Sequence, residues 1–166
     1  MKLWIIPAAA VAIVLSNSAM AKNFSIPDDT PTVKVTIPDD WSPQAIDAGA
    51  QGTSPDGSTY IAAEVLAADD VKAATEASMK VFLKDAEMKI DGSSMQSKQV
   101  DFGSTKATDI TFNGSNEDGP QEFEIMLLPL PTDGKFLVIS YWGTPDGDKA
   151  NKAKFDEIMS SFDLVQ

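Results

Sequence analysis

The chain of 166 residues carries 25 acidic and 13 basic residues, has a formal charge of −12, and contains neither histidine nor cysteine. These absences exclude Ser-His-Asp and Cys-His catalysis, histidine-rich zinc sites, thiol redox chemistry and a disulfide framework. The excess of acid repels phosphate backbones and anionic lipid, so we expect no nucleic-acid partner. No nucleotide-binding motif is present, and we expect no cofactor.

The first 21 residues have the pattern of a secretory signal peptide. Lys2 precedes an apolar stretch, residues 3–15, that is too short to cross a bilayer as a helix. An A-x-A cleavage site ends at Ala21, so the mature protein is predicted to begin at Lys22. Removal of Lys2 with this segment changes the formal charge from −12 to −13. We therefore expect a periplasmic or secreted protein whose mature chain does not insert into a membrane.

After the signal peptide, residues 22–31 are predicted to be a polar leader and residues 32–166 a single domain. Alternating or continuous apolar runs predict seven strands, at residues 32–38, 45–53, 59–66, 95–102, 105–112, 122–128 and 135–142. The last run is apolar at both alternating positions, as in a strand that is covered on both faces.

Two amphipathic helices complete the predicted elements. The first begins after Asp69 or Asp70 and runs to about Ile90. Its apolar stripe consists of Val71, Thr75, Ser78, Met79, Phe82, Leu83, Ala86 and Ile90. The second begins at Pro145, and Phe155, Ile158, Met159 and Phe162 form its stripe. The order predicts an α+β fold, a mainly antiparallel sheet of about six to seven strands flanked by two helices.

Four short segments resemble the PsbP-like superfamily. They are IPDDW at residues 37–41, SPDG at 54–57, VDFG at 100–103 and FDEIMSSF at 155–162. The superfamily includes the extrinsic PsbP subunit of photosystem II, DcrB-like bacterial envelope proteins and a yeast nuclear Ran-binding protein. The resemblance implies a PsbP-like α/β/α sandwich and a non-enzymatic role as an accessory subunit, binding module or chaperone. It implies no shared site residues.

Three aromatic residues are the candidate partner-binding residues. Trp41 follows a predicted turn, and Tyr141 and Trp142 end a predicted strand and face opposite sides of it. Aromatic side chains dominate the energetics of protein interfaces when they are accessible. The sequence therefore favours a non-catalytic binding or accessory module of the bacterial envelope, with a protein partner that presents basic surface.

Two other functions are compatible with the sequence. The abundant carboxylates permit a carboxylate-based hydrolase, which needs a pair of acids brought together in space. A divalent-ion or sugar-binding protein is also possible. Residues whose side-chain oxygens can bind calcium are concentrated in two segments. The first contains Asn113, Asn116, Glu117 and Asp118, and the second contains Asp146 and Asp148. The spacing does not fit the calcium-hand template, so we predict no metal site. We interpret the first segment as an Asx-rich turn, and Asp146 and Asp148 as acids that favour the N-terminus of a helix.

Overall fold

The computed structural model describes residues 20–27, 29–85, 88–117, 119–132 and 134–165. For residues 81–85 it describes the backbone and not the side chains. Most of the predicted signal peptide, residues 1–19, therefore lies outside the described residues. So do Asp118 and Ala86, and the side chains of Phe82 and Leu83. No helix in these described ranges is both long and apolar enough to cross a membrane.

The elements come in runs of strands separated by single helices, as expected for an α+β chain. The strands are β1 (Ala21–Ile26), β2 (Val33–Pro38), β3 (Gln44–Ile46), β4 (Gly49–Thr53), β5 (Thr59–Ala67), β6 (Lys89–Phe102), β7 (Thr105–Asn116), β8 (Gly119–Pro129), β9 (Lys135–Gly143) and β10 (Asp163–Leu164). The helices are α1 (Val71–Asp85) and α2 (Pro145–Ser160), and a 3₁₀ turn lies at Asp39–Trp41.

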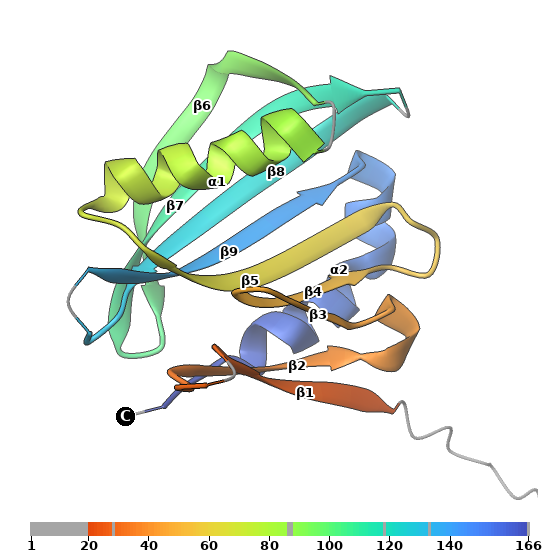
Figure 1. The fold of residues 1–166 in the computed structure, drawn as a ribbon. Coiled ribbons are helices and arrows are strands. Elements are labelled where there is room, and N and C mark those ends of the chain that lie inside the picture. Colours follow the sequence, from red (N-terminus) through yellow and green to blue (C-terminus); the bar gives the residue numbers. More distant parts are fainter. Residues whose placement is uncertain (1–19, 28, 86–87, 118, 133, 166) are drawn as a thin grey trace, which may run out of the picture.

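Two antiparallel sheets organise the molecule (Figure 1). The larger sheet has seven strands in the order β3-β4-β5-β9-β8-β7-β6, and the smaller has the order β1-β2-β10. Helix α1 lies across one face of the large sheet, where it contacts β8 and β9. Helix α2 lies on the opposite face and contacts β2, β5 and β8, which joins the small sheet to the large one.

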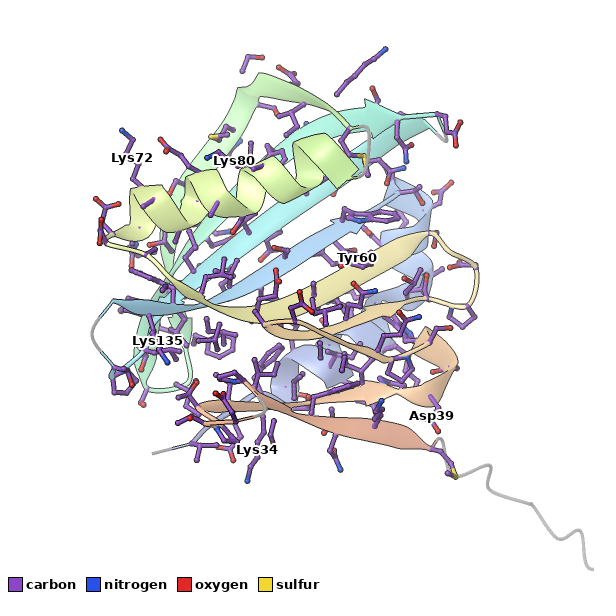
Figure 2. All side chains as sticks on the ribbon, viewed as in Figure 1. Lys34, Asp39, Tyr60, Lys72, Lys80 and Lys135 are labelled. Carbon is purple, nitrogen blue, oxygen red and sulfur yellow. The ribbon has the colours of Figure 1, made fainter. Side chains whose placement is uncertain are left out.

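Strand β9 is central and is covered on both faces, as its composition predicts. Leu137 and Ile139 are buried in the core beside α2, and Phe136 and Val138 are buried in the core beside α1. The outer side of α1 carries exposed lysines, and Lys72 and Lys80 extend away from the sheet (Figure 2). Hydrophobic burial on both sides of one strand thus fixes the layer order.

Local signals set the starts of the helices. The Asp70 carboxylate accepts a hydrogen bond from the Ala73 backbone at 2.8 Å, so Asp70 caps α1. At α2, the Thr144 hydroxyl accepts from the Gly147 backbone at 3.0 Å, and Pro145 occupies the first turn. Both starts agree with the sequence patterns.

The N-terminal segment differs from the predicted polar leader. Residues 21–26 form β1, and Phe24 and Ile26 are buried in the core beside α2. Ala21 and Lys22, which flank the predicted cleavage point, lie opposite Pro38 and Ile37 in the β1–β2 pairing. In the sequence, two alternating apolar residues are too short a pattern to distinguish a strand from a polar leader, and the strand becomes evident only through its pairing with β2.

Three further element boundaries were predicted wrongly. The single strand over residues 45–53 is instead the hairpin β3–β4, which turns between Ile46 and Gly49. The first helix ends at Asp85 and not near Ile90, which belongs to β6. The polar run at residues 113–120 is the end of a long β7–β8 hairpin rather than a loop. The first and third errors lie where polar residues occupy an edge or an exposed strand end, and there hydrophobic periodicity gives no signal. In the second, the apolar spacing continues past the end of the helix, because Ile90 is an apolar residue of the following strand.

Candidate functional site: an acidic groove between the sheet and α2

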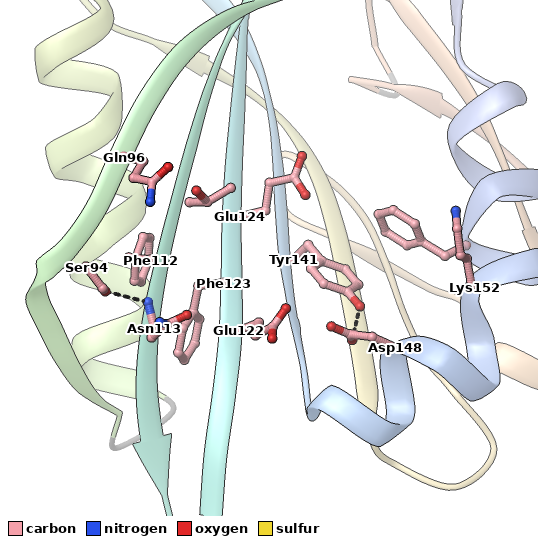
Figure 3. Close-up of a pocket in the computed structure, with 12 residues that line it drawn as sticks. Ser94, Gln96, Phe112, Asn113, Glu122, Phe123, Glu124, Tyr141, Asp148 and Lys152 are labelled. Atoms are coloured by element: carbon pink, nitrogen blue, oxygen red, sulfur yellow. Dashed lines mark hydrogen bonds between the residues drawn. The ribbon is translucent and has the colours of Figure 1, made fainter.

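A groove of about 470 Å³ lies between the large sheet and helix α2 (Figure 3). It is lined from β6 to β9 and from α2 by carboxyl, amide, hydroxyl and aromatic side chains. The residues are Ser94, Gln96, Thr111, Phe112, Asn113, Glu122, Phe123, Glu124, Tyr141, Asp148, Lys152 and Phe155. Three of these carry carboxyl groups, so we name this feature the acidic groove.

Strand alternation places the acids on the groove side of β8. Phe123, Ile125 and Leu127 are buried in the core beside α1, which turns the intervening residues Glu122 and Glu124 to the other face. In register, Glu124 lies between Thr111 of β7 and Tyr141 of β9. The burial that fixes the register of β8 therefore also fixes the two glutamates in the groove.

A tyrosine–aspartate pair joins the sheet to α2 at one end of the groove. The Tyr141 hydroxyl donates a hydrogen bond to the Asp148 carboxylate in the first turn of α2 (Figure 3). Burial and this bond raise the pKa of Tyr141 well above its ordinary value, which keeps the phenol neutral. Gly143 makes the approach possible, because a Cβ atom there would lie 2.1 Å from Asp148 Oδ1.

Beneath the groove, Asp109 on β7 is buried with only 4% of its surface exposed. Its Oδ2 atom lies 3.0 Å from the Lys98 ammonium on the neighbouring edge strand β6. Its Oδ1 atom is buried and has no hydrogen-bond partner among the described residues. Asp109 also contacts the side chain of Glu124. Burial first, and then the charge and proximity of Asp109, raise the pKa of Glu124 to about 7.

The α2 wall of the groove is partly apolar and partly basic. The ring of Phe155 packs against that of Tyr141 with centroids 4.5 Å apart. Phe155 is half-buried, so it belongs to the rim of the groove as well as to the predicted core stripe. Lys152 is exposed, and its ammonium lies 2.8 Å from both carboxylate oxygens of Asp156. The groove therefore has acidic walls, with one surface lysine at its mouth.

The three aromatic residues that were predicted to bind a partner lie in three different places in the structure. Trp41 is buried in the core beside α2 with 1% exposure, so its side chain does not form an accessible surface. Tyr141 lines the acidic groove. Trp142 faces the opposite side, where it is half-buried and stacks on Tyr60 with centroids 5.6 Å apart. The predicted opposite orientation of Tyr141 and Trp142 is thus confirmed.

Of the two oxygen-rich segments considered for calcium, one residue each, Asn113 and Asp148, lines the acidic groove, whereas Asn116 and Asp146 have partners elsewhere. Asn116 accepts a hydrogen bond from Gln121 at the β7–β8 hairpin end, and exposed Asp146 lies 3.3 Å from the Lys149 ammonium. Asp148 is instead engaged by Tyr141. Within the described part of the chain, no group of three or more acidic side chains is placed to hold a metal ion.

Sequence reasoning missed Asp109 and Glu124, although the sequence contains a weak signal for them. Both are acids inside predicted strands, next to Ile110 and Ile125, which alternate onto the buried face. A charged residue in a central strand is unusual and indicates either an open face or a buried partner. Their contact depends on the β7–β8 register, which the sequence alone does not provide.

No protein-family model and no curated protein sequence matches the chain. Solved structures do. The solution structure of cyanobacterial PsbP (CyanoP) from Synechocystis sp. PCC 6803 is 12% identical, with a TM-score of 0.58 over 97% of this chain and 99% of that one.

Two further structures give a comparable likeness. LpqN, described as involved in cell envelope biogenesis of Mycobacterium tuberculosis, is 14% identical, with a TM-score of 0.52 over 88% of this chain and 92% of that one. A mutant of the protein Mog1 is 14% identical, with a TM-score of 0.51 over 89% and 97%. At such identities the likeness concerns the fold, and on that evidence this chain has the PsbP-like fold.

Proposed function

We propose that this chain is an exported, non-catalytic binding module of the bacterial envelope, and that its acidic groove takes a basic segment of a partner protein. The observation that carries the proposal is the groove itself. Glu122, Glu124 and Asp148 line one open cleft, with Phe155 and Tyr141 supplying apolar surface beside them. Carboxylates next to aromatic rings suit lysine and arginine side chains, whose stems are apolar and whose ends are cationic.

Two further observations support this proposal. The sequence begins with a signal-peptide pattern, and the mature chain carries a formal charge of −13 after loss of Lys2, which steers basic partners towards it. The fold is shared with CyanoP and with LpqN, and the latter is involved in cell envelope biogenesis in its own organism. We extend an envelope role to this chain on that basis.

The test is crosslinking in intact cells followed by recovery of the tagged mature protein. Glu122→Lys reverses a charge in the groove at an exposed position, whereas Glu76→Lys makes the same change on the outer side of α1. We expect Glu122→Lys to abolish recovery of a basic partner and Glu76→Lys to leave it unchanged, with recovery falling as salt increases. Equal recovery from both variants would place binding elsewhere on the molecule.

A carboxylate-based hydrolase is the second candidate, and one observation favours it. Glu124, whose pKa is raised to about 7 by burial and by Asp109, lies in the same cleft as Glu122 and Asp148, and enzymes that use two carboxyl groups need one protonated and one ionised. A panel of glycosides and esters tests this alternative. Turnover by the wild type that Glu124→Gln removes would support the hydrolase and contradict the binding module.

A further inference from the structure

One carboxylate oxygen of the buried Asp109 side chain has no hydrogen-bond donor among the described residues. The side chain is buried, its Oδ2 atom is paired with Lys98, and its Oδ1 atom has no donor among the described residues. A buried carboxylate oxygen that has lost water and gained no hydrogen bond is strongly unfavourable. Lys98 comes from the edge strand β6 and is itself mostly exposed, so it compensates only one side of the carboxylate.

The group that faces Asp109 from β8 is another carboxyl group, that of Glu124. In the β7–β8 register Asp109 lies opposite Met126 and Glu124 lies opposite Thr111, so the two acids are diagonal neighbours on the same face of the sheet, and their side chains interact. Two carboxylates in contact repel each other, and the usual resolution is that the pair holds one proton. A protonated Glu124 has an O–H donor, which is what Asp109 Oδ1 lacks. The pKa of Glu124, raised to about 7 by burial and by Asp109, agrees with this arrangement.

We propose that Asp109 and Glu124 share one proton, donated by the Glu124 carboxyl to Asp109 Oδ1, and that a cationic group entering the acidic groove displaces it. The second half of this proposal rests on the proposed function, whereas the first half does not. The proton would make the groove a pH-sensitive site, less negative when Glu124 is protonated and more negative when it is ionised.

Charged and titratable groups face Glu124 from every neighbouring element. They are Lys98 on β6, Asp109 on β7, Glu122 on β8, Tyr141 on β9, and Asp148 and Lys152 on α2. Lys98 lowers the pKa of Glu124, whereas Asp109 and Asp148 raise it. Tyr141 stays neutral because its own pKa is raised. The repulsion from the two aspartates, added to burial, outweighs the single lysine.

The first experiment follows the carboxyl carbons of the mature protein by NMR as pH is changed. We expect the Glu124 signal to titrate with a midpoint near 7, and the midpoint to fall by more than one pH unit in Asp109→Asn, which removes the repelling charge. Glu76→Gln, which removes an acid from the outer side of α1, is the matched control and should leave the midpoint in place. A wild-type midpoint near 4.5 for Glu124, the ordinary glutamate value, would overturn the shared proton.

The second experiment uses hexalysine with an acetylated N-terminus as the probe, because its lysine side chains do not titrate between pH 6 and pH 8 and it has no free α-amino group that would. If binding ionises Glu124, linkage to a group with a pKa of about 7 makes binding about tenfold weaker at pH 6 than at pH 8. Glu124→Gln should lose this dependence. Binding of equal strength at both pH values would overturn displacement of the proton. A neutral midpoint by NMR without hexalysine binding would retain the shared proton and contradict the proposed function.

Discussion

Ile158 is the residue of α2 whose truncation should reveal most about how the groove is built. Its side chain is 0% exposed and lies in the core that joins α2 to the small sheet and to β5. Ile158→Ala removes three carbon atoms, which at about 0.8 kcal/mol each gives about 2.4 kcal/mol of lost burial. The cavity that remains adds to this value, so we expect a total loss of about 3–4 kcal/mol of unfolding free energy.

Urea unfolding of the mature protein measures this loss as a lower transition midpoint with an unchanged slope. Asp156→Asn is the control on the same helix, because it breaks an exposed pair with Lys152 and should cost less than about 0.5 kcal/mol. Similar small losses for both variants would refute the docking of α2 through Ile158. Because α2 forms one wall of the groove, Ile158→Ala should also weaken hexalysine binding under conditions where the protein remains folded.

Three further predictions concern the backbone, acid stability and processing. Gly49→Ala should destabilise the protein by at least about 2 kcal/mol in urea unfolding, because the new Cβ atom would lie 1.8 Å from the Ala63 carbonyl oxygen, whereas Gly92→Ala, with open space around it, should be nearly neutral. Hydrogen bonds from the hydroxyl of Ser54 and from Ser58 hold the pKa of Asp56 well below its usual value of 3.8, so its stabilising effect is present above pH 4 and is lost as pH falls further. Asp56→Asn should therefore flatten the loss of stability between pH 4 and pH 2, and an unchanged slope would contradict this assignment. Intact mass of the protein from an envelope fraction should show an N-terminus at Lys22, and a dominant species that retains Met1 would overturn export.

The shared proton has a consequence for stability that can be checked without a ligand. The pKa of Glu124 in the folded chain is higher than the ordinary value of 4.5. For a group of this kind, the stabilising effect is complete below pH 4.5 and is lost as pH rises through about 7. The singly protonated pair thus favours the folded state at acid pH, and ionisation of Glu124 above neutrality weakens it.

The strongly patterned elements were predictable from the sequence because their signals are local. Strand β9 was predicted from a run that is apolar on both faces, and the starts of α1 and α2 from a capping aspartate and from Pro145. The turn at residues 54–57 was predicted from Pro and Gly, and the Gly57 backbone does bond to the Ser54 carbonyl at 2.9 Å. Each of these signals needs only residues that are close together in the chain.

The tertiary structure decided what depends on distant partners. Strand β1 exists because Phe24 and Ile26 find a core beside β2, and Trp41 is buried because the same core encloses it. The acidic groove required the β7–β8–β9 register and the docking of α2, which bring Asp109, Glu124 and Asp148 together from three separate elements. Composition by itself excluded histidine and cysteine chemistry and established an acidic protein, and the spacing of apolar residues predicted two amphipathic helices and a sheet. Where its carboxylates meet, and hence which of them keeps a proton, is set by pairing across the sheet, because electrostatic coupling depends on distance in space and not on separation along the chain.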